Sequence, residues 1–371
     1  MITIALIGSR GIPAKYGGFE TFVEEVSIGL VKYGYQIIVV GDKEQQEQNN
    51  ELSEYKGVKL IYSKYSKSEN PVFFYWDSLM MGMKVSEIIY SCGSGAGYFA
   101  YLPKIKGKKF ITNPDGIGWE RDKWSFVVKL FLMSMFYATA KFSEYIVCDS
   151  NGIKDVFEKK FKRKYDLDVI EYGADTNNCE NDDDALLDVL KKYGLRSQKY
   201  HLVVSRLEPE NNVDVIIDGY LLKKRKFPLI IVGNRKKTNY VKSIQEKADN
   251  NIVFLGGIYD KNELRLIRQH SFTYLHGHSV GGTNPSLLEA MACRNYCICH
   301  ENVFNKEVVG ENGSYFSDNK SLSDVLDFIE SEKNGVVYHD KKEAVYKRIT
   351  DYYNWDLIVR RYDKYFKNIE G

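Results

Sequence analysis

The sequence predicts an α/β protein made of two doubly wound, Rossmann-like domains that face each other across a central cleft. Its 371 residues exceed the roughly 250–300 residues at which a single hydrophobic core stops growing. Short apolar runs alternate with amphipathic helical runs through the first half, and a second alternating series begins near residue 200. Such alternation is typical of a parallel sheet covered by helices on both faces.

In the first half, apolar runs predict strands, and a 3.6-residue periodicity predicts helices. Val169–Asp175 is predicted to be a strand ending in a turn, and the polar residues Thr176–Asp184 that follow are typical of an interdomain linker. We therefore place an N-terminal domain at residues 1–172 and a second domain at residues 173–351. The strands expected before the linker are Thr3–Gly8, Gln36–Gly41, Val58–Tyr62, Phe110–Thr112 and Tyr145–Cys148, and the helices are Phe19–Lys32 and Phe73–Ile89.

The second half repeats the pattern after the linker. Its last segment, Tyr352–Phe366, is an aromatic-rich helical stretch that contains Trp355. The expected strands are Tyr200–Val204, Leu229–Gly233, Ile252–Leu255 and Phe272–Leu275, and the expected helices are Val213–Lys224, Tyr240–Asp249, Asn262–Gln269 and Pro285–Ala292.

Composition and charge narrow the functional classes. The net charge is +2 with basic and acidic residues nearly balanced, so there is no electrostatic footprint for nucleic acid. The N-terminus lacks a leader pattern, and no run approaches the roughly 18–20 apolar residues that span a bilayer. We expect a cytoplasmic protein. Its six cysteines form no C-x-x-C pair, so we expect reduced thiols and no metal site.

The run Trp124–Ala140 is the most apolar stretch, although Lys129 and Ser134 interrupt it. We expect a buried helix here. The alternative is a helix docked on the inner membrane surface, with Lys123, Lys129 and Lys141 near the lipid headgroups.

The strongest local signal follows the strand Phe272–Leu275. Asn284 and Pro285 open the next helix, because Asn is a favoured N-cap and Pro suits the first helical position. The following backbone N–H groups are expected to lack intrahelical partners, and with the helix dipole they favour an anion. The alternative is an ordinary capped helix with Glu289 solvated. We predict a nucleotide-diphosphate site that includes Gly281, Gly282, Thr283, Asn284, Ser286, Leu287 and Glu289, the last accepting from ribose hydroxyls.

A second signal is the loop after the strand Tyr200–Val204. Arg206 comes just past the carboxyl end of this strand, where open α/β sheets bind ligands. Its fixed charge and fork of donors suit a diphosphate. The alternative is a surface arginine paired with Glu208 or Glu210. Two such loops in one half of the chain favour a shared donor site that includes Arg206, Glu210 and Asn211.

The first βα loop, residues 8–20, is long and carries Gly17 and Gly18 before a helix. That helix N-terminus is predicted to touch a phosphate from the opposite domain. A dinucleotide site would require G-x-G-x-x-G here with an acid after the second strand. Asp42 is present, but the glycine spacing is wrong.

A fourth loop, residues 113–121, follows the strand Phe110–Thr112. It combines carboxylates, an aromatic ring and a guanidinium, which suits the positioning of an acceptor, with Trp119 lying against a sugar face. The alternative is a structural loop in which Asp115 caps the turn and Arg121 pairs with an acid. The candidate acceptor residues are Asp115, Trp119, Glu120 and Arg121.

Together these loops resemble the family 4 glycosyltransferases of the GT-B fold. Arg206 with Glu210 resembles the family loop G-R-L-x-x-E-K-G, and Pro285–Ala292 resembles its helix P-S-x-x-E-A-M-A. The runs Gly8–Pro13, Tyr16–Phe22 and His276–Ser286 are similar to bacterial rhamnosyltransferases of polysaccharide assembly in capsules and cell walls. That subgroup adds L-rhamnose from dTDP-L-rhamnose to a lipid-diphosphate-linked glucose or N-acetylglucosamine.

Two departures from the family pattern bear on the donor. Asn211 replaces the usual lysine, which leaves Arg206 to carry more of the diphosphate charge. Eight positions before Glu289, where the broader family has a glutamate that holds donor sugar hydroxyls, this chain has Gly281. The absence of that acid favours a donor unlike glucose, such as a 6-deoxysugar. Asp115 stands where many relatives have a histidine.

The resemblance implies a retaining, front-face mechanism in which the leaving diphosphate accepts the acceptor proton. Arg206 and the helix N-terminus would stabilise the developing charge, with Glu289 on the donor, and neither a metal nor a cofactor is implied. Asp115 would orient the acceptor hydroxyl, and Arg121 would contact the acceptor diphosphate. As in GT-B relatives, helix 352–371 is expected to pack back on the N-terminal domain.

Four other functions are alternatives for this sequence. A sugar-nucleotide epimerase on this fold requires paired acid and base groups, of which there is no convincing set. A nicotinamide-dependent oxidoreductase conflicts with the glycine spacing. A non-catalytic binding subunit of the same fold, or a transferase for another nucleotide sugar, also stays open.

Overall fold

The computed structural model describes residues 2–14, 17–49, 51–163, 166–176, 183–234, 238–331 and 335–370. Most of the predicted linker, residues 177–182, lies outside the described residues. The chain divides into two compact units, each with its own parallel sheet. Unit 1 comprises Met1–Glu120, Trp124–Gly173 and Trp355–Gly371, and unit 2 comprises Arg121–Lys123 and Ala174–Asn354. The predicted class, two Rossmann-like α/β domains, is confirmed.

Within the described residues, the sheet of unit 1 has eight strands in the order β3-β4-β2-β1-β5-β6-β7-β8, and only β3 and β4 pair antiparallel. The central strand β1 is buried throughout, because helices cover both faces of a parallel sheet. The strands are β1 Thr3–Ile7, β2 Gln36–Gly41, β3 Glu54–Tyr55, β4 Val58–Tyr62, β5 Ile88–Cys92, β6 Lys109–Asn113, β7 Tyr145–Cys148 and β8 Leu167–Val169.

Two predicted elements of unit 1 are wrong at their ends. The helix expected at Phe73–Ile89 is α3, Pro71–Val85, and the next residues form β5, which pairs with both β1 and β6. The strand expected at Val169–Asp175 lies earlier, as the edge strand β8. After Ile170 donates its N–H to Cys148 O, the chain leaves the sheet. In both cases sheet pairing decides where the strand lies, and a local pattern does not contain that information.

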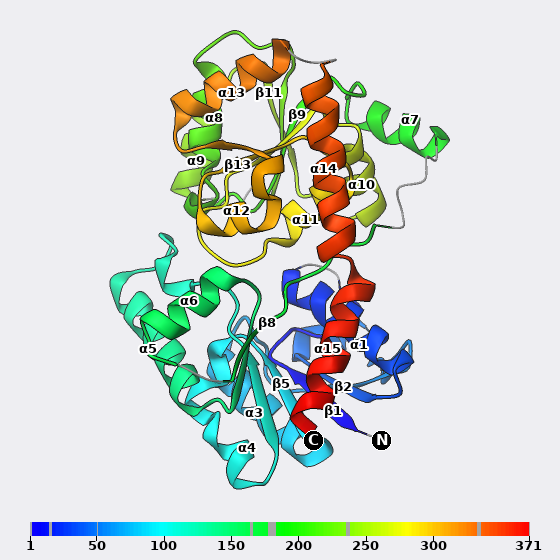
Figure 1. Cartoon of the computed structure of the whole chain (residues 1–371), viewed down its shortest axis with the longest axis vertical. Coiled ribbons are helices and arrows are strands. Elements are labelled where there is room, and N and C mark those ends of the chain that lie inside the picture. The colour runs from blue at the N-terminus through cyan, green and yellow to red at the C-terminus, as the bar shows by residue number, and fades with distance from the viewer. Residues whose placement is uncertain are drawn as a thin grey trace. The chain divides into compact units, whose positions relative to one another are not determined.

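Helices of unit 1 cover the sheet with both early and late parts of the chain (Figure 1). The C-terminal helix α15, Trp355–Glu370, packs beside α1, Gly18–Lys32. Tyr362 of α15 lies 2.8 Å, hydroxyl to hydroxyl, from Tyr90 of β5, and the Phe22 ring of α1 contacts both tyrosines. This aromatic cluster ties the last helix to the sheet of unit 1.

The helix α5, Phe126–Phe142, corrects the expectation of a buried helix at Trp124–Ala140. Only a stripe that includes Phe136 and Ala140 is buried, because α5 packs by one side against the turns η1, Ser94–Phe99, and η2, Gly118–Glu120. Phe126 and Val127 are each 74% exposed. An exposed apolar face of this kind is a common mark of an interaction surface.

The sheet of unit 2 runs in the order β11-β10-β9-β12-β13-β14 in the described residues, with parallel neighbours throughout. Figure 1 shows α8, α9 and α13 on one face and α10, α11 and α14 on the other. The strands are β9 His201–Val204, β10 Leu229–Val232, β11 Ile252–Gly256, β12 Thr273–His276, β13 Cys297–His300 and β14 Ser314–Phe316. The helices are α8 Val213–Leu221, α9 Asn239–Lys247, α10 Lys261–Gln269, α11 Pro285–Ala292, α13 Asn319–Ser331 and α14 Val336–Tyr352.

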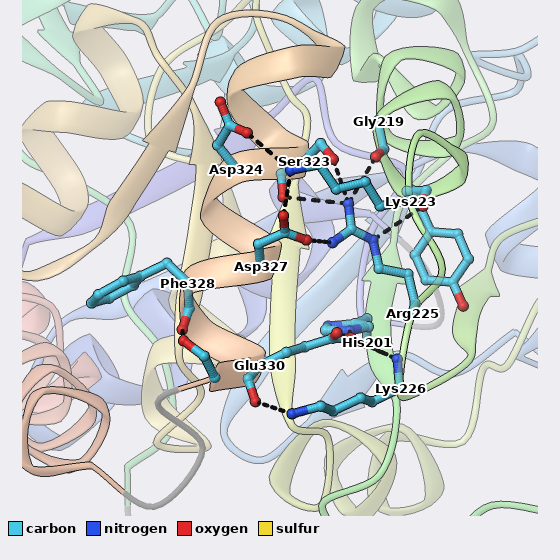
Figure 2. A network of polar contacts seen from close by, with 12 residues as sticks. His201, Gly219, Lys223, Arg225, Lys226, Ser323, Asp324, Asp327, Phe328 and Glu330 are labelled. Atoms are coloured by element: carbon cyan, nitrogen blue, oxygen red, sulfur yellow. Dashed lines mark hydrogen bonds and ion pairs between the residues drawn. The ribbon is translucent and has the colours of Figure 1, made fainter.

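A buried polar network fastens α13 to the sheet of unit 2 (Figure 2). Arg225, in the loop before β10, donates to Ser323 Oγ at 2.6 Å and pairs with Asp327. His201, at the start of β9, contacts Glu330 Oε1 at 3.1 Å and Thr273 Oγ1 at 2.7 Å. Burial lowers the pKa of His201, so its ring is neutral at pH 7. The network lies at the amino-terminal end of the sheet, and the loops that follow β9 and β12 lie at the opposite, carboxyl end.

Candidate functional site

The candidate site of unit 2 lies where the strand order reverses. The chain adds β10 and β11 on one side of β9, and β12, β13 and β14 on the other. In open α/β sheets such a switch point is where loops diverge and ligands bind. The loop after β9, residues 205–212, and the loop after β12, residues 277–284, therefore start side by side, and they are the two loops that the sequence singles out.

Hydrogen bonds hold these two loops together. Asn212 Nδ2 donates to Gly277 O at 2.7 Å, and Ser279 donates to Glu210 O through both its backbone N and its Oγ, each at 3.0 Å. Gly277 permits this approach, since a Cβ there would lie 2.1 Å from Asn211 O. These hydrogen bonds consequently hold the two loops in one fixed arrangement.

The start of α11 is capped as the sequence predicts, but with a different consequence. Asn284 Oδ1 accepts from Ser286 N at 2.9 Å, and Asn284 O accepts from the N–H groups of Leu287 and Leu288. The expectation that these three N–H groups lack partners is therefore wrong, because the cap and a tight first turn satisfy them. What favours an anion here is the helix dipole.

Ser286, a predicted donor ligand, directs its hydroxyl toward the sheet. Its Oγ donates to Val204 O at 3.0 Å and lies 2.7 Å from the Tyr274 hydroxyl. The hydroxyl therefore joins α11 to β9 and β12. Leu287 and Thr283 are also buried, so their side chains serve the packing of this end of the sheet.

Glu289 is the exposed acid of α11, with 45% of its side chain accessible. One carboxylate oxygen, Oε2, lies 2.6 Å from Arg268 at the end of α10. Burial would lower the pKa of Arg268, but Glu289 and Tyr274 outweigh burial and raise it. Arg268 thus fixes the orientation of Glu289 while keeping its own charge. Sequence reasoning missed Arg268, because only the fold brings α10 beside α11.

Arg206 extends from the loop after β9 with 44% of its side chain exposed, and its Nε lies 3.9 Å from Glu208 Oε2. Glu208 in turn lies 2.8 Å from Lys123 Nζ. Burial alone would raise the pKa of Glu208, but Lys123 and Arg206 outweigh it and lower the pKa. Because Lys123 pairs closely with Glu208, Glu208 offsets little of the positive charge that Arg206 presents to a ligand.

The other two predicted residues of this loop point inward. Glu210 and Asn211 are both buried. Asn211 Nδ2 donates to Arg206 O at 2.6 Å, and its Oδ1 lies 2.6 Å from Nδ1 of His278. Both polar atoms of the Asn211 amide thus have partners within the two loops, which makes Asn211 a positioning residue. His278 was not among the predicted site residues.

In unit 1, Gly17 is the N-cap of α1 and Gly18 its first residue. The carboxylate of Glu20 lies against Gly17 and accepts a hydrogen bond from Arg10 N at 3.0 Å. A phosphate at this helix end would meet that carboxylate. The predicted contact of Gly17 and Gly18 with a diphosphate stays a prediction.

The loop after β6 contains the predicted acceptor residues. Asp115 has a left-handed backbone, φ 65°, and donates its N–H to Asn113 Oδ1. Trp119 is buried and packs edge-on against Phe136, with ring centroids 4.6 Å apart. The prediction that Trp119 lies against a sugar is therefore corrected: its ring belongs to the core beneath α5.

The remaining two residues of that loop fall on different units. Glu120 is exposed at the end of η2 in unit 1, whereas Arg121 groups with unit 2. Arg121 Nε is buried and makes no hydrogen bond to the described residues. The described residues contain no cluster of side chains suited to hold a metal ion. In the same part of the chain, no helix has the length and apolarity to cross a membrane.

Comparison with known proteins identifies the two halves separately. Residues 1–175 match a domain of unknown function, DUF1972. Residues 189–348 match the family described as glycosyl transferases group 1. This range contains the two hydrogen-bonded loops, residues 205–212 and 277–284, which we call the stapled loops. The chain carries a group 1 glycosyltransferase domain.

Curated relatives agree with this assignment. An uncharacterised glycosyltransferase of Methanocaldococcus jannaschii is 26% identical over 287 residues, which cover 73% of this chain and 71% of the relative. An O-antigen chain mannosyltransferase B of Escherichia coli is 28% identical, over 34% of this chain and 35% of the relative. Both relatives are named as sugar transferases, in keeping with the domain match.

Solved structures share the GT-B fold across the chain. A sucrose-phosphate synthase from Thermosynechococcus elongatus superposes with a TM-score of 0.81 at 13% identity, covering 100% of this chain and 99% of the other. HepE from Anabaena, in complex with UDP-glucose, gives a TM-score of 0.77 at 13% identity over 99% of this chain and 100% of its own. At these identities the likeness shows the fold alone.

The exposed charge of Arg206 leads to a binding prediction for this glycosyltransferase. We expect Arg206→Ala to weaken the binding of dTDP about tenfold or more, because a charge-assisted hydrogen bond to phosphate is lost. Isothermal titration calorimetry at fixed ionic strength measures this. Arg196→Ala, which removes an equally charged exposed residue before β9, is the matched control and should bind dTDP like the native protein. Equal affinity of the Arg206 and Arg196 variants would remove Arg206 from the donor site.

Proposed function

We propose that this group 1 glycosyltransferase moves L-rhamnose from dTDP-L-rhamnose to a lipid-diphosphate-linked sugar in the synthesis of a cell-surface polysaccharide. The observation that carries the proposal is the pair of stapled loops at the switch point of unit 2. They offer an exposed Arg206, a helix N-terminus and Glu289 at one end of the sheet. The sequence runs shared with rhamnosyltransferases support the sugar, and the O-antigen transferase among the relatives supports the polysaccharide class.

The proposed chemistry retains the anomeric configuration. The acceptor hydroxyl oxygen forms a bond to C1 of the sugar on the face from which the diphosphate leaves. The C1–O bond to the diphosphate breaks, and a phosphate oxygen takes the acceptor proton. Arg206 and the dipole of α11 stabilise the negative charge that develops on the leaving group.

Two carboxylates have separate roles in this scheme. Glu289 is held by Arg268 on one oxygen, which orients the acid to accept hydrogen bonds from the donor ribose. Asp115, at the carboxyl end of β6, would orient the acceptor hydroxyl. Its left-handed backbone is uncommon for residues other than glycine, and Asp adopts it more often than most.

The donor sugar is inferred from what the loop after β12 lacks. Gly281 has a φ of 135°, a value that residues with a side chain rarely adopt. The loop therefore holds no acid at this position for the hydroxyls of a glucose-type donor, which supports a deoxysugar.

A peripheral contact with the inner membrane surface follows from the lipid-linked acceptor. We define the α5 patch as a set of exposed aromatic and aliphatic side chains of α5 and of the adjacent residues 98–101. Phe131 contacts Tyr98 and Phe142 contacts Tyr101, with centroids 6.4 and 5.9 Å apart. Such a surface gains free energy by entering the headgroup region. The α5 patch consists of Tyr98, Tyr101, Phe126, Val127, Leu130, Phe131 and Phe142.

One correction to the predicted membrane contact concerns its basic residues. Lys123 pairs with Glu208 and Glu210, so it is not placed at lipid headgroups. Lys141 is exposed on α5 and supplies positive charge beside the α5 patch.

A donor panel tests the transfer reaction. With a short-chain polyprenyl-diphosphate sugar as acceptor, we expect transfer from dTDP-L-rhamnose to exceed that from UDP-glucose, UDP-N-acetylglucosamine and GDP-mannose. Product mass and the anomeric proton signal identify the sugar and its configuration. Preference for another donor would overturn the rhamnosyl assignment, and transfer from none would favour a non-catalytic subunit.

Vesicle sedimentation tests the α5 patch. We expect Phe126→Ser with Phe131→Ser to abolish binding to vesicles that contain anionic lipid, because the apolar area that enters the interface is lost. Phe328→Ser is the matched control, since Phe328 is 50% exposed on α13 of unit 2. Sedimentation of the double variant equal to that of the control would exclude the α5 patch as the membrane contact.

A further inference from the structure

His278 occupies the junction of the two stapled loops and has no role in the function proposed above. It lies in the loop after β12, three residues before Gly281, and its Nδ1 contacts Asn211 in the loop after β9. Unlike His276, which is buried and stacked on Tyr274 with centroids 6.0 Å apart, His278 is only partly buried. The His278 ring is thus less enclosed by the protein than that of His276.

The hydrogen bonds around His278 determine its tautomer. Asn211 Nδ2 donates to Arg206 O at 2.6 Å, so Asn211 Oδ1 is the atom that faces His278. An amide oxygen accepts hydrogen bonds and cannot donate them. Nδ1 of His278 therefore carries a proton, which it donates to Asn211 at 2.6 Å. The remaining nitrogen, Nε2, then carries no proton in the neutral ring.

The charge state of the ring follows from its surroundings. Desolvation, the largest effect, and the positive charges of Arg121 and Arg206 lower the pKa of His278 to about 3, with His300 adding to the shift and the backbone of Val280 opposing it. His278 is thus a neutral imidazole at pH 7, and its Nε2 presents a lone pair instead of an N–H.

The position of Nε2 relative to Gly281 shows which part of a donor it would meet. A Cβ built on Gly281 would lie 3.0 Å from Nε2, so the imidazole fills the space that a side chain at 281 would use. Arg206, which the proposed function assigns to the diphosphate, lies in the loop fixed to His278 through Asn211. The ring therefore lies beside Gly281 and close in the structure to the loop that contains Arg206.

We propose that His278 is a specificity-determining residue for the donor sugar: held by Asn211, its unprotonated Nε2 accepts a hydrogen bond from a hydroxyl of the transferred sugar. This inference rests on the proposed function, because it requires a nucleotide-sugar at the two loops. In this arrangement a neutral imidazole accepts the hydrogen bond from the sugar. The glutamate that the broader family has at position 281 would be a charged hydrogen-bond acceptor. Asn211 is then the positioning residue that sets both the ring orientation and the tautomer.

Substitutions at His278 separate sugar recognition from nucleotide binding. We expect His278→Ala to lower kcat/KM for the native nucleotide-sugar about tenfold or more, because a hydrogen bond to the sugar is lost. The Kd for dTDP, which lacks the sugar, should stay within about twofold of the native value. Selectivity among donors that share dTDP but differ in the sugar should fall in the same variant. His339→Ala, which removes an exposed histidine of α14, is the matched control.

Conservative variants keep the test independent of folding. The amide oxygen of glutamine can occupy the position of Nε2, and that of asparagine the position of Nδ1. We therefore expect His278→Gln to recover most of the donor selectivity and His278→Asn to recover little. Thermal unfolding of each variant, together with its Kd for dTDP, verifies that the loops are intact.

Each outcome bears on one inference. If the native protein neither binds dTDP nor transfers any sugar, the proposed function fails. If the native protein transfers sugar and His278→Ala behaves like His339→Ala, only the role of His278 is overturned. Equal losses of dTDP affinity in His278→Ala and Arg206→Ala would also overturn it, because His278 would then serve the diphosphate or the shape of the loops.

Discussion

The site of this glycosyltransferase depends on the parallel pairing of β9 and β12, because that pairing starts two distant loops from neighbouring points. The loops are about seventy residues apart in sequence, yet Asn212, Ser279 and the Asn211–His278 contact join them directly. Backbone carbonyls accept most of these bonds, so the staple fixes the path of the chain as well as the side chains. These hydrogen bonds are partly buried, so a bond that loses one partner leaves the other poorly satisfied.

Charge is distributed over the two loops in a way that suits a diphosphate donor. Lys123 neutralises Glu208, and Arg268 orients Glu289, so Arg206 is the exposed cation beside the glycine loop. The N-terminus of α11 adds a partial positive charge of fixed direction. His278, by contrast, is kept neutral by burial and by the same arginines that favour an anion. The phosphate end and the sugar end of a donor would therefore meet different electrostatic environments within a few residues.

The sequence predicts much of this arrangement and misses what only packing decides. Most strands, the N-cap Asn284 and the position of Arg206 after β9 follow from local pattern and strand-end logic, and the structure confirms the α/β class. The expectation that the N–H groups of Ser286–Leu288 lack partners was wrong, because the cap residue Asn284 accepts hydrogen bonds from all three. Trp119 and Asn211 carry side chains that suit ligands, but burial turns both inward. Arg268 has no signal in the sequence, and His278 appears only as part of the run His276–Ser286 that resembles rhamnosyltransferases. The contacts of both residues arise between separate elements.

We propose that the two stapled loops of unit 2 bind the nucleotide diphosphate. Hydrogen–deuterium exchange with and without saturating dTDP tests it directly, because bound phosphates slow the exchange of the backbone N–H groups around them. We expect slower exchange in peptides that cover residues 205–212 and 277–288, with the rest of unit 2 little changed. Unchanged exchange in both peptides, with slowing confined to residues 8–14 and 17–20 of unit 1, would contradict it.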